Sequence, residues 1–170
     1  YTPTAFVLST MPLIELNGIS RYYGEGDTLV KALDGIDLNI KQGEIVALLG
    51  PSGSGKTTLL NTIAALDIPT EGTYSFDGNE VPMGKVESMT SFRRENIGYI
   101  FQFFNLLADL TALENVLLVQ DLAGSRDSEK AIQLLETVGL KGLENRFPSQ
   151  MSGGQRQRVA IARSLAKSPR

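Results

Sequence analysis

The 170-residue sequence contains no cysteine and no histidine. The absence of cysteine excludes disulfide frameworks, cysteine-based zinc sites and thiol nucleophiles. The absence of histidine removes the usual general base near neutral pH and every histidine-ligated metal site. Together these absences exclude Ser-His-Asp chemistry and thiol chemistry within these residues.

The sequence also lacks long apolar runs and a large excess of charge of either sign. No stretch of about 18 apolar residues occurs, so the sequence predicts no segment that spans a bilayer. The formal net charge of −3 does not favour a protein that coats DNA or binds membranes through a polybasic surface. A hydrophobic content of 42% is ordinary for one folded domain and argues against intrinsic disorder.

The first residues are uncharged but do not fit a signal peptide. Pro3 and Pro12 interrupt them, and no basic segment precedes them. Met11 looks like a natural start. The sequence therefore predicts residues 1–10 to be a tail or upstream sequence.

Short strand patterns fill the first part of the sequence. Two continuous apolar runs, 45–49 and 97–101, are typical of strands buried on both faces of a parallel sheet. The other predicted strands are half-buried and end at glycine-containing turns. The strands are expected over 14–22, 30–40, 45–49, 73–76 and 97–101.

Helical patterns dominate the second part. After an early helix predicted over 56–66, three further helices are expected over 111–122, 128–138 and 152–167. Thr111 is followed three residues later by Glu114, which is a capping-box arrangement. This order of elements predicts an α/β fold with strands early and helices late.

A glycine-rich segment joins the apolar run at 45–49 to the first predicted helix. It reads Gly50, Pro51, Ser52, Gly53, Ser54, Gly55, Lys56, Thr57, Thr58, and it matches G-x-x-x-x-G-K-[ST]. Glycines let backbone N–H groups turn inward and converge on a polyphosphate, and the helix that begins near Lys56 adds the positive end of its dipole. Lys56 would neutralise β- and γ-phosphate oxygens, and the Thr57 hydroxyl would ligate Mg²⁺.

The alternative is a glycine-rich turn with an accidental lysine. A random match of this kind occurs in roughly one chain in a hundred. Here a strand pattern precedes the segment and a helix pattern follows it, which is the context that the motif requires. The sequence therefore favours a phosphate-binding loop.

A second helix start also resembles an anion site. Met151, Ser152, Gly153, Gly154 and Gln155 precede the last predicted helix. Ser152 is a good N-cap, and the glycines leave backbone N–H groups without side chains in the way. Taken alone, the pattern is typical of an ordinary capped helix. Beside a phosphate-binding loop, it suggests a site that another subunit completes.

These residues carry a family resemblance. Met151 to Gln155 resembles the L-S-G-G-Q signature of ATP-binding cassette (ABC) ATPases, with Met151 in place of leucine, and 155–163 is similar to the helix that follows it. Tyr23 matches the aromatic residue that stacks on adenine in this family, and Gln102 matches its Q-loop glutamine. The resemblance covers residues 11–170.

The resemblance implies a P-loop NTPase core with an N-terminal antiparallel β subdomain and a helical subdomain. It implies ATP and Mg²⁺ as ligands and a head-to-tail dimer of two ATPase subunits. Ser152, Gly153 and Gly154 would contact the γ-phosphate that the partner subunit holds. Gln102 would contact Mg²⁺ or the attacking water. A transmembrane permease subunit and a peripheral location on the cytoplasmic face of the membrane follow from the same resemblance, and nucleic acid is not an expected partner.

Two of these residues have plainer interpretations. Without the flanking motifs, Gln102 would be an exposed loop amide. Tyr23 could be an aromatic residue at a sheet edge, and Tyr22 competes for the stacking role, although the spacing from Gly26 favours Tyr23.

Five basic residues are interpreted as solvated helix faces without chemistry: Arg93, Arg94, Arg156, Arg158 and Arg163.

The family pattern further implies a strand that ends in Asp-Glu, followed later by a switch histidine. Neither occurs in the sequence, so we interpret the chain as an N-terminal fragment with negligible ATP turnover that lacks the C-terminal strands of the sheet. The expected division is a nucleotide-binding core with the β subdomain over 11–102 and the helical subdomain with the signature helix over 103–170.

The stretches 66–73 and 97–116 look like the lipoprotein-release and macrolide-export branch of the family. Two alternatives stay open. A non-transport ABC-type ATPase acting on DNA or ribosomes usually carries zinc cysteines, coiled-coil insertions or paired cassettes, which this sequence does not show. Another P-loop NTPase, such as a kinase or a GTPase, would make Met151 to Gln155 a coincidence, and the N-K-x-D motif of GTPases is absent.

Overall fold

A computed structural model describes residues 11–169 of the chain. The chain divides between Met89 and Thr90 into two compact units, and each is described by itself. The tail predicted at residues 1–10 lies outside the described residues.

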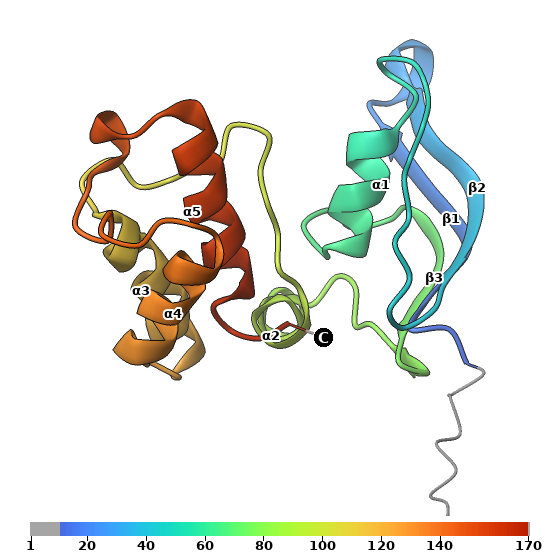
Figure 1. Cartoon of the computed structure of the whole chain (residues 1–170). Helices are drawn as coiled ribbons and strands as arrows, with labels where there is room; N and C mark the ends of the chain where they lie inside the picture. Colours follow the sequence, from blue (N-terminus) through green and yellow to red (C-terminus); the bar gives the residue numbers. More distant parts are fainter. Residues whose placement is uncertain (1–10, 170) are drawn as a thin grey trace, which may run out of the picture. The chain divides into compact units, whose positions relative to one another are not determined.

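The first unit is built on a four-stranded antiparallel sheet (Figure 1). Its strands are β1 (Ile14–Tyr23), β2 (Val30–Ile40), β3 (Glu71–Phe76) and β4 (Asn79–Glu80), in the spatial order β2-β1-β3-β4. Every neighbouring pair is antiparallel, and a short 3₁₀ turn (Gly26–Thr28) lies between β1 and β2. This confirms the antiparallel β subdomain that the resemblance implied.

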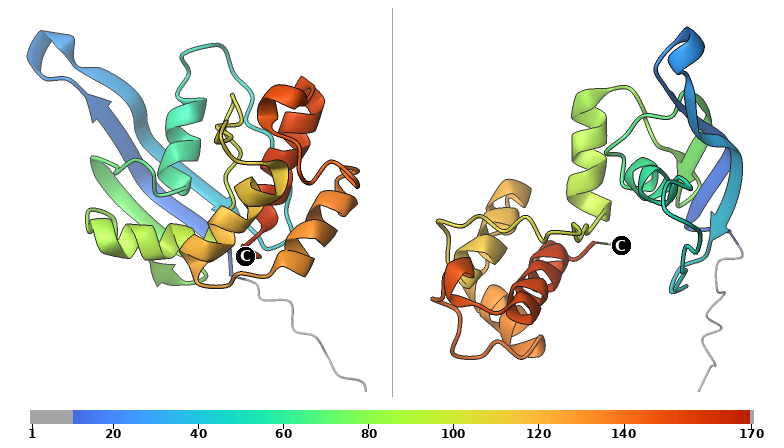
Figure 2. Two further views of the ribbon diagram at one scale, coloured as in Figure 1. Left: turned by 90° about the vertical axis from the view of Figure 1, so that its left-hand side faces the viewer. Right: turned by 90° about the horizontal axis from the view of Figure 1, so that it is seen from above.

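The helix α1 (Lys56–Ile63) lies along one face of this sheet (Figures 1 and 2). The core of this unit includes three fully buried side chains from its strands, Leu16, Ile19 and Tyr74. The Tyr74 hydroxyl donates to the carbonyl oxygen of Ile63 at 3.0 Å and so joins β3 to the end of α1. The helix α1 is therefore fixed to the sheet.

The apolar run at 45–49 differs from its prediction. It pairs with no strand of the described chain, and Ile45 and Leu49 are 97% and 91% exposed. A strand inside a parallel sheet is buried by strands on both sides and by helices on both faces. The sheet formed within residues 11–169 is wholly antiparallel, so it supplies none of that cover. The prediction of a buried strand at 45–49 is therefore wrong for the structure formed by residues 11–169.

Two further sequence boundaries need correction. The run at 97–101 also forms no strand, and Ile100 and Phe101 are 46% and 37% exposed, for the same physical reason. The helix expected over 56–66 ends at Ile63, because Ala65 adopts a left-handed backbone with φ 52°.

The helix α2 (Val86–Asn96) crosses the division between the two units and was not predicted. Its sequence is polar, and only Met89 within it is buried, so the apolar periodicity that indicates a helix is weak. Arg93 donates to the Thr90 hydroxyl at 2.9 Å.

The second unit is helical, as predicted. It contains α3 (Ala112–Ala123), α4 (Ser128–Thr137) and α5 (Gly153–Leu165), with a 3₁₀ turn at Pro148–Gln150 before α5. The capping box predicted at Thr111 is present, and the predicted N-cap Ser152 forms a second capping box with Gln155. The buried core of the bundle consists of Ala112, Val116, Leu117, Ala131, Leu135, Leu140, Met151, Val159, Ala162 and Ala166.

Two buried amides organise the loops of this unit. Asn115 on α3 accepts from the Leu107 backbone N–H at 2.9 Å and donates to the carbonyls of Leu107 and Leu110 at 3.1 and 3.0 Å. Gln120 accepts from the Asp127 backbone N–H at 3.0 Å. Because each amide bonds backbone groups outside its own helix, the loop before α3 and the start of α4 are both fixed to α3.

Over residues 11–169, no helix combines the length and the apolar character needed to cross a membrane.

Candidate functional site

The phosphate-loop candidate, residues 50–58, has the backbone that its sequence predicts. Gly53 and Gly55 have φ of +81° and +85°, in the left-handed region that glycine adopts without strain. Gly55 is the N-cap of α1. A glycine N-cap has no side chain to satisfy the first-turn N–H groups, so those groups remain available as donors for a ligand.

Gly55 is required by space as well as by backbone angle. A Cβ at this position would overlap the carbonyl oxygen of Ala32 on β2 and lie 3.2 Å from the Leu33 Cδ2 atom. At Gly53 no atom lies within 4 Å of an added Cβ. The loop is therefore held against β2 at Gly55 and open at Gly53.

The Lys56 side chain lies across this loop. Its ammonium donates to the carbonyl oxygens of Gly50 at 2.8 Å and Pro51 at 2.6 Å, and to the Ser54 hydroxyl at 3.4 Å. These partners are neutral oxygens on an exposed loop. Oxygens of a polyphosphate would be stronger partners for the ammonium because they carry charge. The Thr57 side chain is exposed beside it, while Thr58 is half-buried.

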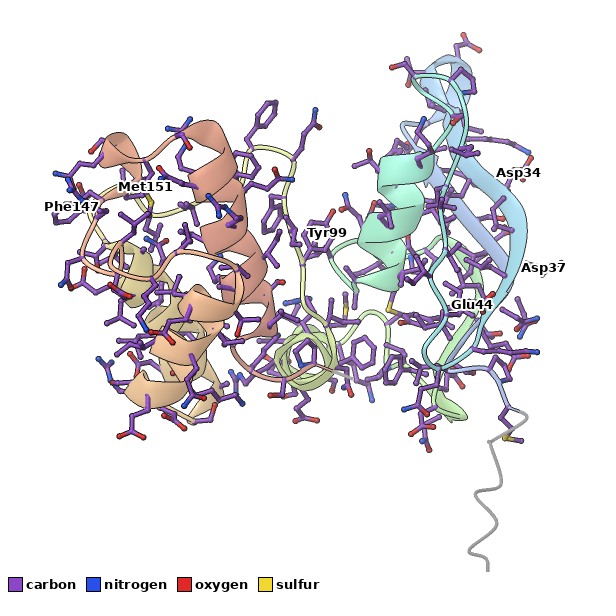
Figure 3. All side chains as sticks on the ribbon, viewed as in Figure 1. Asp34, Asp37, Glu44, Tyr99, Phe147 and Met151 are labelled. Carbon is purple, nitrogen blue, oxygen red and sulfur yellow. The ribbon has the colours of Figure 1, made fainter. Side chains whose placement is uncertain are left out.

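The structure separates the two tyrosines that competed for the stacking role. The Tyr23 hydroxyl donates to Asp67 in the turn after α1, so its ring lies on the α1 side of the sheet. The Tyr22 hydroxyl donates to Asp34 at 2.7 Å, and Asp34 lies on the side away from α1 (Figure 3). Of the two, Tyr23 shares a face with the helix that follows the phosphate loop.

In the second unit, Gln102 lies in an exposed turn after the run at 97–101. Phe103 beside it is 81% exposed. The next two residues, Phe104 and Asn105, both adopt left-handed backbone, with φ of 63° and 47°. Two consecutive non-glycine residues in this region store strain that a contact must offset.

That contact comes from an arginine that sequence reasoning misassigned. Arg163 on α5 donates to the carbonyl oxygens of Phe104 and Asn105 at 2.6 and 2.7 Å. Burial lowers the pKa of its guanidinium below the ordinary value. Arg158 donates to the carbonyls of Val138 and Gly139, each at 3.2 Å. These side chains are not a solvated face, because they satisfy loop carbonyls.

The signature segment is anchored at one end and exposed at the other. Met151 is 5% exposed and belongs to the helical core, and Arg156 donates to its carbonyl oxygen at 2.9 Å. Figure 3 labels Met151 just before α5. The Ser152 hydroxyl accepts from the Gln155 N–H at 3.2 Å, and the Gln155 side chain accepts from the Ser152 N–H at 2.8 Å.

The two glycines that follow complete this helix start. Gly153 and Gly154 are exposed, and no atom lies within 4 Å of a Cβ added to either. The Ser-Gly-Gly turn therefore presents its backbone to the outside, while Met151 and the capping box hold it in place.

The family model described as "ABC transporter" matches residues 33–170. The chain belongs to the ABC transporter family. The matched residues include the phosphate-loop candidate at 50–58 and the signature segment at 151–155.

The similarity to several ABC relatives extends over nearly the whole chain. It is 50% identical over 159 residues to a macrolide export ATP-binding/permease protein MacB of Hyphomonas neptunium, covering 92% of this chain and 25% of that protein. It is 47% identical over 156 residues to MacB of Escherichia coli, covering 90% and 24%. An uncharacterized ABC transporter ATP-binding protein of Mycobacterium tuberculosis is 44% identical over 165 residues, covering 95% and 66%. The chain thus spans about a quarter of the length of the MacB relatives.

Solved ABC cassettes have the same fold. The dimeric cassette MJ0796 in a post-hydrolysis state with ADP and Pi is 42% identical, with a TM-score of 0.85. A second dimeric structure of MJ0796 is 43% identical, with a TM-score of 0.84. Each match covers 92% of this chain and 70% of the other chain.

The donor set of the phosphate-loop candidate fits a triphosphate with Mg²⁺. One ammonium, the N–H groups of a helix start without a side-chain cap, and a threonine hydroxyl are the groups that a triphosphate and its cation need. The open space at Gly53 leaves room for a ligand to approach the backbone.

Proposed function

We propose that the chain is the ATP-binding part of an ABC transporter and couples ATP binding and hydrolysis to substrate movement by a membrane partner. The observation that carries the proposal is the Lys56 ammonium folded over a loop whose helix begins at Gly55 without a side-chain cap. The sequence motif and the backbone agree on one ligand class, a nucleoside triphosphate.

Within this proposal each loop residue has a role. Residues 50–58, apart from Pro51, which has no N–H, surround the phosphates with backbone N–H groups, and Lys56 neutralises the β- and γ-phosphates. The Thr57 hydroxyl would ligate Mg²⁺, which would neutralise phosphate charge when bound. The family resemblance assigns to Gln102 a contact with Mg²⁺ or with the attacking water. Tyr23 stacks on the base. These assignments are supported by the exposure of Thr57, Gln102 and the Tyr23 ring.

A second subunit completes the site in this proposal. Ser152, Gly153 and Gly154 contact the γ-phosphate bound by the partner, and their exposure and open surroundings support that role. The similarity to two dimeric cassettes supports it further. The Gln155 side chain supports the turn through the capping box and adds its backbone N–H to the helix start.

The membrane partner is proposed on two grounds. The MacB relatives are described as ATP-binding/permease proteins. In addition, Phe103 and Leu107 are 81% and 48% exposed around Gln102, which is typical of a contact surface. The chain would then lie at the cytoplasmic face of the membrane as a peripheral component.

We do not assign ATP turnover to residues 1–170 alone. They contain no histidine and no Asp-Glu pair, so the polarising carboxylate and the switch histidine of the family pattern are not among them. Residues 11–102 are proposed as the nucleotide-binding core and residues 103–170 as the helical subdomain. Phosphate release by these residues at the rate of a complete cassette would contradict this assignment.

The composite site is tested with Ser152→Arg in the full-length natural protein. An arginine at this exposed helix start would block a partner's γ-phosphate without touching the phosphate loop. We expect Mg-ATP binding by equilibrium dialysis to be unchanged, while ATP-dependent dimerisation by light scattering and ATP turnover are lost. The matched control is Ser125→Arg, an exposed serine in the turn after α3. Equal loss of binding and dimerisation in Ser152→Arg, or no loss of either, would contradict the composite site.

A further inference from the structure

The Tyr23 ring is held at two places by neighbours outside the phosphate loop. Its hydroxyl donates to Asp67, which follows α1. The guanidinium of Arg21, two residues earlier on β1, lies over the ring with its central carbon 4.5 Å from the centroid. The Arg21 Nη2 atom lies 2.7 Å from Asp67 Oδ1, which closes a triangle of three side chains.

Burial separates this triangle from an ordinary surface ion pair. The side chains of Arg21 and Asp67 are only 26% and 17% exposed. The Arg21 Nε atom is buried and has no hydrogen-bond partner among the described residues. An unpaired buried donor is unfavourable. The contacts with the Tyr23 ring and with Asp67 therefore hold the guanidinium in this position against that cost.

Asp67 links the triangle to the helix of the phosphate loop. The Asp67 Oδ1 atom also accepts from the Ile68 N–H at 2.9 Å. The backbone N–H of Asp67 donates to the carbonyl oxygen of Asn61 on α1 at 3.2 Å. Both carboxylate oxygens are therefore engaged. The position of the Tyr23 ring is set by the end of the helix that begins at Lys56.

A guanidinium over one face of an aromatic ring leaves the other face for a planar group. The Tyr23 residue is 40% exposed, so part of its surface is open. A cation above the ring also fixes the tilt of the ring, because cation–π attraction is strongest near the ring axis. A base that stacks on such a ring meets a surface that is already oriented.

We propose that Arg21 and Asp67 are positioning residues that hold Tyr23 as a one-sided platform for the nucleotide base. The inference rests on the proposed function, since it adds two residues to the base end of the same site. Arg21 and Asp67 then contribute to nucleotide affinity through the base and contribute nothing through the phosphates.

The test compares Mg-ATP with magnesium tripolyphosphate, which has the phosphates but no base. Affinities for both are measured by calorimetry on the full-length natural protein and on Arg21→Met, Arg21→Lys and Asp67→Asn. We expect Arg21→Met and Asp67→Asn to weaken Mg-ATP binding roughly fivefold and to leave tripolyphosphate binding within about twofold. Arg21→Lys keeps a cation near the ring, so it should recover part of the loss.

Lys31→Met is the matched control. Lys31 lies 5.1 Å from the Tyr22 ring centroid and pairs with Asp34, so it makes the same type of contact with the other tyrosine. This variant should change neither affinity. Unfolding curves for each variant show whether a loss reflects the site or the fold, because a general structural defect would weaken both ligands together.

Several outcomes overturn the inference. It fails if Arg21→Met leaves Mg-ATP affinity unchanged, increases it, or lowers both affinities equally. It also fails, with the phosphate site intact, if the natural protein binds Mg-ATP no better than tripolyphosphate. If the natural protein binds neither ligand, the proposed function itself fails and the inference fails with it.

Discussion

The Arg163 guanidinium holds the backbone carbonyl oxygen of Phe104 at 2.6 Å, 59 residues away in the sequence. Its other terminal nitrogen holds the carbonyl of Asn105 at 2.7 Å. Both loop residues have left-handed backbone angles, which cost roughly 1–2 kcal/mol for each non-glycine residue. One side chain on the signature helix therefore fixes the strained loop that follows Gln102.

Removing this guanidinium should release the loop. We expect Arg163→Ala to lower the free energy of unfolding by about 2–3 kcal/mol, because two charge-assisted bonds and their strain compensation are lost. Chymotrypsin should cut after Phe103 or Phe104 faster than in the natural protein. Gln157→Ala, at an exposed position of the same helix, is the control. Unchanged cleavage and stability in Arg163→Ala would show that the loop is held by other contacts.

Alanine substitutions at two glycines of the loop distinguish the cost of steric crowding from the cost of backbone strain. Gly53→Ala suffers only the left-handed backbone, about 1–2 kcal/mol, since nothing lies near its Cβ. Gly55→Ala adds an overlap with the Ala32 carbonyl, so we expect it to cost at least about 1 kcal/mol more. Urea unfolding of both variants measures the difference. Equal costs would mean that the loop does not lie against β2.

The cap of α3 should respond to acid. The Glu114 carboxylate accepts from the Thr111 N–H at 2.8 Å, and bonds from the Thr111 backbone and side chain hold the pKa of Glu114 below its ordinary value. A depressed native pKa means that the cap stabilises the fold above the unfolded-state pKa and stops doing so as the pH falls through the native pKa.

Carboxyl-carbon NMR titration of Glu114 measures this effect directly. We expect a native pKa below the ordinary glutamate value in the natural protein and a value closer to it in Thr111→Ala. The stability difference between the natural protein and Glu114→Gln should shrink in acid. An ordinary pKa in the natural protein would contradict the capping geometry.

The exposed aromatic beside Gln102 should matter for the membrane partner and not for the nucleotide. We expect Phe103→Asp to abolish co-purification with a transmembrane partner while Mg-ATP binding is unchanged, because a charge would be placed in an apolar contact. Leu122→Asp changes a leucine on α3 that is 65% exposed and serves as the control. Normal co-purification of Phe103→Asp would move the contact surface elsewhere.

Local signals predicted the local structure well. The strand at Val30–Ile40, the caps at Thr111 and Ser152, and the glycine turn at Gly55 each depend on residues close in sequence. The fold class followed from the same signals and from the family resemblance. The polar helix α2 was missed because its apolar periodicity is weak.

Other features could not be predicted because their partners are remote. Whether the run at 45–49 is buried depends on neighbouring strands, which the antiparallel sheet of residues 11–169 does not provide. The role of Arg163 depends on carbonyls 58 and 59 residues away. The spacing from Gly26 favoured Tyr23 over Tyr22, but the partners that place the two hydroxyls, Asp67 and Asp34, could not be predicted. A helix pattern marks an arginine as polar and does not reveal which carbonyl it meets.

The central claim is that Lys56 and its loop bind the phosphates of a nucleotide. Equilibrium dialysis of Mg-ATP against the full-length natural protein, Lys56→Ala and the exposed-site control Lys85→Ala tests it most directly. We expect tight binding by the natural protein and the control, and a loss of roughly tenfold to a hundredfold or more in Lys56→Ala, because one charge-assisted contact to phosphate is removed. Equal Mg-ATP affinity in Lys56→Ala and the natural protein would contradict the claim.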